Sequence, residues 1–262
     1  MSGFGWWLRD SWEMVKRNLI HIKRTPELLL DVTLSPIMFV LLFNFVWGGA
    51  INVGAEGGEE GSYINFLMAG IFVQTIAFAG IYTSVLLAND LQKGMIDRFR
   101  SLPMSQSSVL TGRTLTDLLR ATLAIAIMFV VGILVGFRAD GGIGGSLTAV
   151  GIMLLFGFAL SWVGVAMGAL VRTPEALQGI IFAVVFPLTF VSSAFVPTFS
   201  MSGPIAWFAE NQPMTQVVNA VRDLTLGINQ YDSELPSIVW SVAILVVAFP
   251  LGVWLYNRRT TQ

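Results

Sequence analysis

The sequence predicts an all-α integral membrane protein that crosses the bilayer six times. Hydrophobic residues make up 55% of its 262 residues, and charged residues only 12%, whereas soluble domains carry about 25% charged residues. Several apolar runs exceed the roughly 20 residues that a helix needs to cross a hydrocarbon core of about 30 Å. We expect residues 1–262 to form a single transmembrane domain.

Residues 1–25 are predicted to form an amphipathic helix that lies in the membrane interface. Trp12 falls on its apolar face and Lys16 on its charged face. The segment lacks the compact apolar core of a secretory signal peptide, so we expect it to be retained. A surface anchor with no further role remains an alternative for this helix.

Six apolar segments are the predicted spans. Thr25 is a suitable N-cap for the first span, and Pro26 a suitable first helical residue. Pro36 in the first span and Pro250 in the last are expected to kink their helices. The predicted spans are residues 27–47, 63–88, 110–137, 147–171, 176–196 and 237–256.

Two spans carry patterns that indicate helix packing. The third span begins with Arg113, Asp117 and Arg120, which share a helix face and can pair locally. The fourth span is rich in glycine, which lets membrane helices approach closely. These glycines are Gly151, Gly157, Gly164 and Gly168.

Residues 197–236 are predicted to be an outer segment that contains a short amphipathic helix. Apolar residues recur at helical spacing after Pro213, so the helix would sit at the membrane surface or dip into it. The apolar residues are Met214, Val217, Val218, Val221 and Leu224.

Basic residues are distributed unevenly between the two sides of this topology. Six spans place both termini on one side, and 13 of the 15 Lys and Arg residues fall there, which leaves Arg138 and Arg222 opposite. Because short cytoplasmic loops are enriched in Lys and Arg, we expect both termini and residues 89–105 to be cytoplasmic, in an inner (plasma) membrane.

The residue inventory argues against catalysis by this chain. It has no cysteine and one histidine, His21, and it has no phosphate loop, H-E-x-x-H motif or G-x-S-x-G elbow. Paired carboxylates inside the predicted spans are absent as well. We therefore expect no bound cofactor, no metal and no nucleic-acid partner, and an energy source outside the chain.

Residues 89–105 form a charged amphipathic segment between two apolar spans. Its apolar residues Leu91, Met95, Phe99 and Leu102 recur at helical spacing, and Pro103 ends the pattern. Such a ridge suits docking into a groove of a soluble partner. The alternative, a helix whose ridge only rests on lipid, remains open from periodicity alone.

Three stretches resemble the ABC-2 type permeases, and particularly their daunorubicin-resistance group of multidrug and lipid exporters. NDLQKGMIDRFRSLPMSQSSVLTGR is similar to the cytoplasmic loop of that family, with Asp90 at its acidic position. RTPELLLDVTLSPIMFVLLF resembles the entry into its first span, and NQPMTQVVNAVRDLTLG resembles its outer segment before the last span.

The resemblance implies a permease homodimer docked on two separate ATPase subunits that bind ATP and Mg. Residues 90–102 would then be the coupling helix and residues 4–22 a connecting helix beside it, whereas the outer segment would contain re-entrant helices. The implied ATPase-contacting residues are Trp12, Lys16, Asp90, Leu91, Lys93, Met95, Asp97, Arg98, Phe99 and Leu102.

By the same resemblance, the first, second and fifth spans would line a pathway for a hydrophobic drug or lipid that leaves the cytoplasm or the inner leaflet. The candidates are Phe39, Phe43, Gln74, Phe78, Phe186 and Phe190. An ion-driven carrier or channel and an assembly protein that uses the cytoplasmic helix as a tether are the competing functions. ATP-dependent transport with a partner subunit would distinguish the three.

Overall fold

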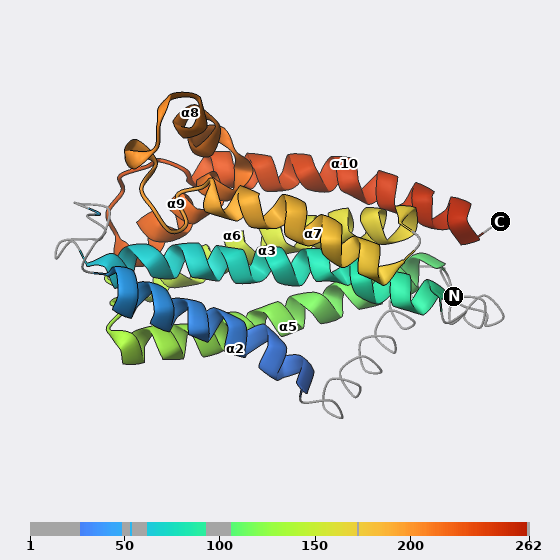
Figure 1. The fold of residues 1–262 in the computed structure, drawn as a ribbon, viewed down its shortest axis with the longest axis horizontal. Helices are drawn as coiled ribbons and strands as arrows, with labels where there is room; N and C mark the ends of the chain where they lie inside the picture. The colour runs from blue at the N-terminus through green and yellow to red at the C-terminus, as the bar shows by residue number, and fades with distance from the viewer. Residues whose placement is uncertain (1–26, 49–52, 54–61, 93–105, 172, 261–262) are drawn as a thin grey trace.

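The structure, a computed structural model, describes residues 27–48, 53, 62–92, 106–171 and 173–260. All regular structure in this part of the chain is helical, which confirms the all-α prediction. The long helices run along one axis and form an elongated bundle (Figure 1). The predicted interfacial helix over residues 1–25 lies outside the described residues.

The long helices follow the predicted spans closely, with most ends shifted by a few residues. Pro36 and Pro250 lie inside helices α2 and α10, and the first helix ends in a π-helical turn, η1. The elements are α2 (Glu27–Leu42), η1 (Phe43–Trp47), α3 (Tyr63–Gln92), α5 (Gln106–Val135), α6 (Gly142–Leu170), α7 (Pro174–Phe190) and α10 (Glu234–Thr260).

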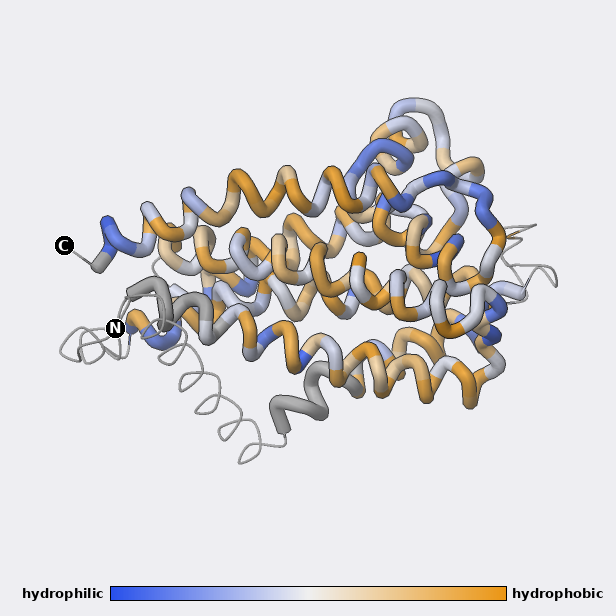
Figure 2. The backbone as a smooth tube through the Cα atoms, turned by 180° about the vertical axis from the view of Figure 1, so that it is seen from behind, coloured by the Kyte–Doolittle hydropathy of each residue, from blue (hydrophilic) through white to orange (hydrophobic). Residues whose placement is uncertain are grey.

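Four of the described helices, α3, α5, α6 and α10, are long and apolar enough to cross a membrane. Two shorter apolar helices, residues 36–46 and α7, run beside them. Hydrophobic residues occupy the middle of the bundle, and hydrophilic residues gather toward its two ends (Figure 2). The end of α3, the start of α5 and the end of α10 lie at one end of the bundle (Figure 1).

Helix α3 is the central helix of the bundle, because nearly all of its residues from Tyr63 to Ala88 are buried. Glycines bring α6 close to it: a Cβ at Gly164 would lie 3.0 Å from the carbonyl oxygen of Gly80. A Cβ at Gly157 or Gly168 would also meet atoms of α3, whereas a Cβ at Gly151 would meet no atom of a neighbouring element within 4 Å. Close helix approach therefore depends on three of the four predicted glycines.

Helix α7 ends at Phe190, six residues before the end of the predicted span. The chain then turns through residues 191–196 and packs on α3, where a Cβ at Gly70 would lie 2.0 Å from the carbonyl oxygen of Ala194. Only a glycine at position 70 accommodates this backbone. The last residues of the predicted span, 191–196, are thus a packed turn and not part of helix α7.

Three short elements follow at the bundle end opposite the end of α10: η3 (Thr198–Ser200), α8 (Gly203–Asn211) and α9 (Pro213–Leu226). Helix α9 begins at the predicted Pro213 and ends at Leu226, and the capping residue that follows, Gly227, has a φ of 69° that suits a glycine. Eleven of its 14 residues are buried, and it packs against α3, α6 and α10. It is thus an internal helix of the bundle end.

Candidate functional site

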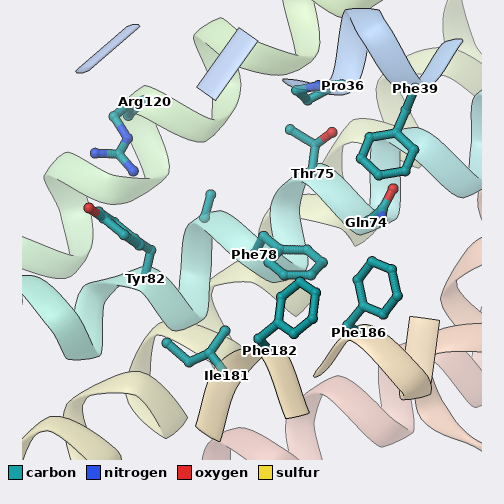
Figure 3. Close-up of a pocket in the computed structure, with 11 residues that line it drawn as sticks. Pro36, Phe39, Gln74, Thr75, Phe78, Tyr82, Arg120, Ile181, Phe182 and Phe186 are labelled. Atoms are coloured by element: carbon teal, nitrogen blue, oxygen red, sulfur yellow. The ribbon is translucent and has the colours of Figure 1, made fainter. Parts of the chain in front are cut away.

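A pocket of about 310 Å³ lies between α2, α3, α5 and α7 (Figure 3). Its volume is near the lower limit of ligand-binding pockets, which span about 300–1,000 Å³. Aromatic side chains from three helices dominate its lining. The lining residues are Pro36, Phe39, Gln74, Thr75, Phe78, Ala79, Tyr82, Arg120, Ile181, Phe182 and Phe186.

Helical spacing explains how α3 and α7 present these side chains together. Gln74, Phe78 and Tyr82 follow one another every four residues along α3, and Phe182 and Phe186 do the same on α7. The Thr75 hydroxyl donates to the carbonyl oxygen of Ile71 at 2.7 Å, so its polar group is satisfied within its own helix. Each helix thus turns one continuous stripe toward the pocket.

The pocket has two chemically different ends. Arg120 and Tyr82 lie together at one end, and Phe39, Gln74 and Phe186 lie at the other (Figure 3). Tyr82 is eight residues beyond Gln74 on α3, which corresponds to about 12 Å along the helix axis. The guanidinium carbon of Arg120 is 6.0 Å from the centre of the Tyr82 ring.

Arg120 and Asp117 both contact α3 from α5. The Thr83 hydroxyl donates to Asp117 Oδ2 at 2.6 Å, and both residues are buried. Arg120 is only 7% exposed, and its Nε has no hydrogen-bond partner among the described residues. The sequence groups Asp117 and Arg120 on one face of α5, and the structure shows that this face also contacts α3.

A series of closely packed phenylalanines, here called the aromatic ladder, includes three residues of the pocket lining and extends from the pocket toward the α9 end of the bundle. Its members are Phe182, Phe186 and Phe190 of α7, Phe195 of the following turn, and Phe43 and Phe39 of the first helix. Successive ring centres lie 4.8, 4.4, 4.9, 4.7 and 6.0 Å apart in that order. These separations are typical of aromatic packing.

Arg222 of α9 connects three elements at the end of the bundle to which the ladder extends. Its guanidinium donates to the carbonyl oxygen of Phe66 at 3.2 Å, to that of Ser193 at 2.7 Å and to Asn219 Oδ1 at 3.0 Å. The guanidinium carbon lies 3.8 Å from the centre of the Phe66 ring. Because Arg222 is fully buried, these contacts bind α9, α3 and the turn after α7 together.

Two further side chains satisfy the backbone where α7 ends. Gln212 Nε2 donates to the carbonyl oxygens of Leu188, at 3.0 Å, and Val191. The Tyr63 hydroxyl donates to the carbonyl oxygen of Phe195 at 3.1 Å. The end of α7 and the turn after it can therefore be buried without leaving these carbonyl groups unpaired.

The structure brings the predicted pathway residues into one region. Phe39, Gln74, Phe78 and Phe186 line the pocket. Phe43 and Phe190 lie beyond it: Phe43 stacks on Phe195, and Phe190 packs on Phe195 with its ring tilted by 33°. Whether a substrate touches these side chains stays a prediction.

Most of the predicted ATPase-contacting residues lie outside the described residues, namely Trp12, Lys16, Lys93, Met95, Asp97, Arg98, Phe99 and Leu102. Asp90 and Leu91 are described and belong to the last turn of α3. Leu91 packs against a cluster that includes Leu87, Trp162 and Tyr256. This packing connects the start of the charged segment to α6 and α10.

Sequence reasoning missed Tyr82, Arg120, Phe182 and Phe195 as members of this region. The four-residue spacing of Phe182, Phe186 and Phe190 was a usable signal. No pattern in the sequence indicates that Arg120 faces Tyr82, because that contact depends on how α5 packs on α3. Among the described residues there is no cluster of three or more His, Cys, Asp or Glu that could hold a metal ion.

Comparison with known proteins identifies the family. The model of the ABC-2 type transporter family matches residues 10–226. The chain is 35% identical to the daunorubicin resistance ABC transporter permease protein DrrB1 of Streptomyces coeruleorubidus, over 94% of this chain and 85% of that protein. It is 26% identical to the probable doxorubicin resistance ABC transporter permease protein DrrC of Mycobacterium tuberculosis, over 87% and 80%. The chain belongs to the ABC-2 type transporter family and is a multi-pass membrane permease subunit.

Proposed function

We propose that this permease exports hydrophobic drugs or lipids from the cytoplasm or the inner leaflet, driven by ATP that a separate subunit hydrolyses. The relatives described above are drug-resistance permeases, which supports the drug class. In this proposal two copies of the chain assemble with two ATPase subunits, and ATP and Mg bind to those subunits only.

The proposed topology has six spans in the inner (plasma) membrane and cytoplasmic termini. Helix α2 and η1 together cover residues 27–47, a length of about 31 Å at 1.5 Å per residue. The 17 residues of α7 give about 26 Å, which is near the lower limit for a span. The excess of Lys and Arg on the side of the termini supports the orientation.

The observation that carries the proposal is the pocket with the aromatic ladder beside it. Phe182 is 63% exposed, so the pocket is open to the outside of the bundle next to α7, where a hydrophobic molecule can enter from the membrane. The ladder extends from there toward the α9 end, which is the outer end in the proposed orientation. Export then requires the contacts of Arg222 and Gln212 at that end to open.

Helix α3 supplies a route for coupling. It is one continuous helix of 30 residues: its last turn carries Asp90 and Leu91, and its middle carries Gln74 and Tyr82 of the pocket. A shift of residues 90–102 that follows ATPase closure would therefore be applied directly to the pocket lining, as coupling between two sites requires.

The direct test uses the permease reconstituted in liposomes with the ATPase subunit expected from a neighbouring reading frame. We expect ATP-dependent movement of members of a panel that includes daunorubicin and a fluorescent lipid, and no movement without ATP. Movement by the permease alone under an ion gradient would establish the competing carrier function instead. No movement in either condition would favour the assembly protein.

The coupling assignment has its own test. Phe99→Asp places a charge on the predicted apolar ridge, so we expect it to abolish co-purification with the ATPase subunit while the permease still inserts. Phe199→Asp is the matched control, because Phe199 is exposed and belongs to η3, which lies at the bundle end opposite the last turn of α3. Retained co-purification of Phe99→Asp would overturn the assignment.

A further inference from the structure

The polar end of the pocket contains a buried charge, the guanidinium of Arg120, that makes few polar contacts with the described residues. Arg120 is 7% exposed, and its Nε is fully buried without a hydrogen-bond partner among the described residues. An arginine so placed inside an apolar bundle is costly unless it is paired, and such residues usually mark a functional site. The ring of Tyr82, 6.0 Å away, is a weak partner for a full positive charge.

Asp117, one turn earlier on α5, is engaged elsewhere. Its Oδ2 accepts a hydrogen bond from Thr83 on α3, and neither Asp117 nor Thr83 lines the pocket. Arg120 does line it, as the member of the lining with a full charge. The pocket therefore presents a cation beside Tyr82 at one end and the rings of Phe39 and Phe186 beside Gln74 at the other.

We propose that this pocket binds an amphiphile that carries one acidic group, a carboxylate or a phosphate, with the acid on Arg120 and an aromatic or acyl body among Phe39, Phe78, Phe182 and Phe186. The inference rests on the proposed function and narrows it, because the substrate that it names is an acidic amphiphile and not an amine such as daunorubicin. A guanidinium pairs with either acid through two parallel hydrogen bonds.

The size and opening of the pocket limit further which ligands can bind. A volume of about 310 Å³ is suited to one aromatic body or one acyl chain, since it lies at the small end of ligand-binding pockets, which measure about 300–1,000 Å³. A phospholipid with two chains would exceed it. The exposure of Phe182 opens the pocket beside α7, so the ligand can enter from the bilayer with its body still in an apolar environment.

The test measures binding by the purified permease alone, in nanodiscs of zwitterionic lipid and without ATP. The probes share one aromatic body and differ only in charge: pyrenebutyrate, pyrenebutanol and pyrenebutylamine. We expect pyrenebutyrate to bind at least about tenfold more tightly than pyrenebutanol, the factor that one charge-assisted hydrogen bond provides. Pyrenebutylamine should bind most weakly.

Variants identify the group responsible. Arg120→Gln should remove the preference for pyrenebutyrate, and Arg120→Lys should retain part of it. Arg138→Gln is the control: it removes an exposed arginine outside the pocket and should leave the preference unchanged. Competition by laurate and by dodecyl phosphate distinguishes a carboxylate from a phosphate ligand, and either result supports the proposal.

Equal affinity of the wild-type protein for the three probes, or tighter binding of the amine, would overturn the proposal. A preference for the anion that survives in Arg120→Gln would overturn it as well. The wild-type comparison stands even if Arg120→Gln fails to fold. Because no ATPase subunit is present, a negative result here leaves ATP-driven export untouched, whereas failed export with intact anion binding would refute only the proposed function.

Discussion

Replacement of Arg222 is expected to unfold the bundle end that holds α9. Arg222→Met keeps most of the side-chain volume but removes the donors that reach Phe66, Ser193 and Asn219. Two of these acceptors are backbone carbonyl oxygens, and the side chain of Arg222 is fully buried. Water therefore cannot replace the lost donor without opening the structure.

The size of the effect follows from these contacts. A buried acceptor that loses its donor costs about 1–3 kcal/mol, so the loss of three donors together is expected to destabilise the protein by about 3–5 kcal/mol. Each kcal/mol lowers the melting temperature of a domain of 150–250 residues by about 2–4 °C. We thus expect Arg222→Met to melt about 6–20 °C below the wild type. Arg222→Lys keeps the charge but loses the planar guanidinium donors, so its melting temperature should lie between those of the wild type and Arg222→Met.

The assay is thermal unfolding of the detergent-purified permease, followed by loss of the monodisperse peak in size-exclusion chromatography. Arg138→Met is the matched control, because Arg138 is exposed and lies at the same bundle end, where its loop meets α9 through the hydrogen bond from Gly141 to Thr225. The control should change the free energy of unfolding by less than about 0.5 kcal/mol. A melting temperature of Arg222→Met within 2 °C of the control would refute the reasoning.

Two further substitutions test the packing of the bundle. Gly70→Ala would place a Cβ 2.0 Å from the carbonyl oxygen of Ala194, so we expect it to lower the free energy of unfolding by about 1–3 kcal/mol or more. Gly151→Ala is the control and should be neutral, because a Cβ there meets open space. Equal melting temperatures of the two variants would contradict the close approach. Arg259→Gln removes the donor to the carbonyl oxygens of Gly168, Ala169 and Val171. We expect faster hydrogen–deuterium exchange in the α6–α7 connection, measured by mass spectrometry against Arg258→Gln, and unchanged exchange would count against this contact.

The sequence was sufficient to predict where most helices lie. Pro213 marks the start of α9, because a proline at the first helical position acts through local backbone geometry. The predicted cap of the first span, Thr25 and Pro26, lies outside the described residues. The π-helical turn at residues 43–47 has no such local signature. It lies where Phe43 stacks on Phe195, far along the chain, so it accompanies a tertiary contact.

The charged residues show where sequence reasoning ends. Helical periodicity groups Asp117 with Arg120, but it describes neighbours on one helix only. It does not reveal that Asp117 accepts a hydrogen bond from Thr83 on α3 or that Arg120 lies over Tyr82. Arg222 likewise enters the sequence argument only as one of two basic residues on the outer side. Its acceptors at Phe66 and Ser193 lie 156 and 29 residues away.

The two buried arginines thus have opposite roles for a physical reason. Arg222 donates to three acceptors and lies on the face of Phe66, so its charge is compensated by the folded chain and its removal should lower stability. The Nε of both arginines lacks a partner in the described part of the chain, so the difference lies elsewhere: the side chain of Arg120 borders a cavity. Its charge is a cost to the empty bundle that an acidic ligand can offset. Removal of Arg120 should therefore change ligand preference more than stability, and the two sets of variants together separate a structural arginine from a binding one.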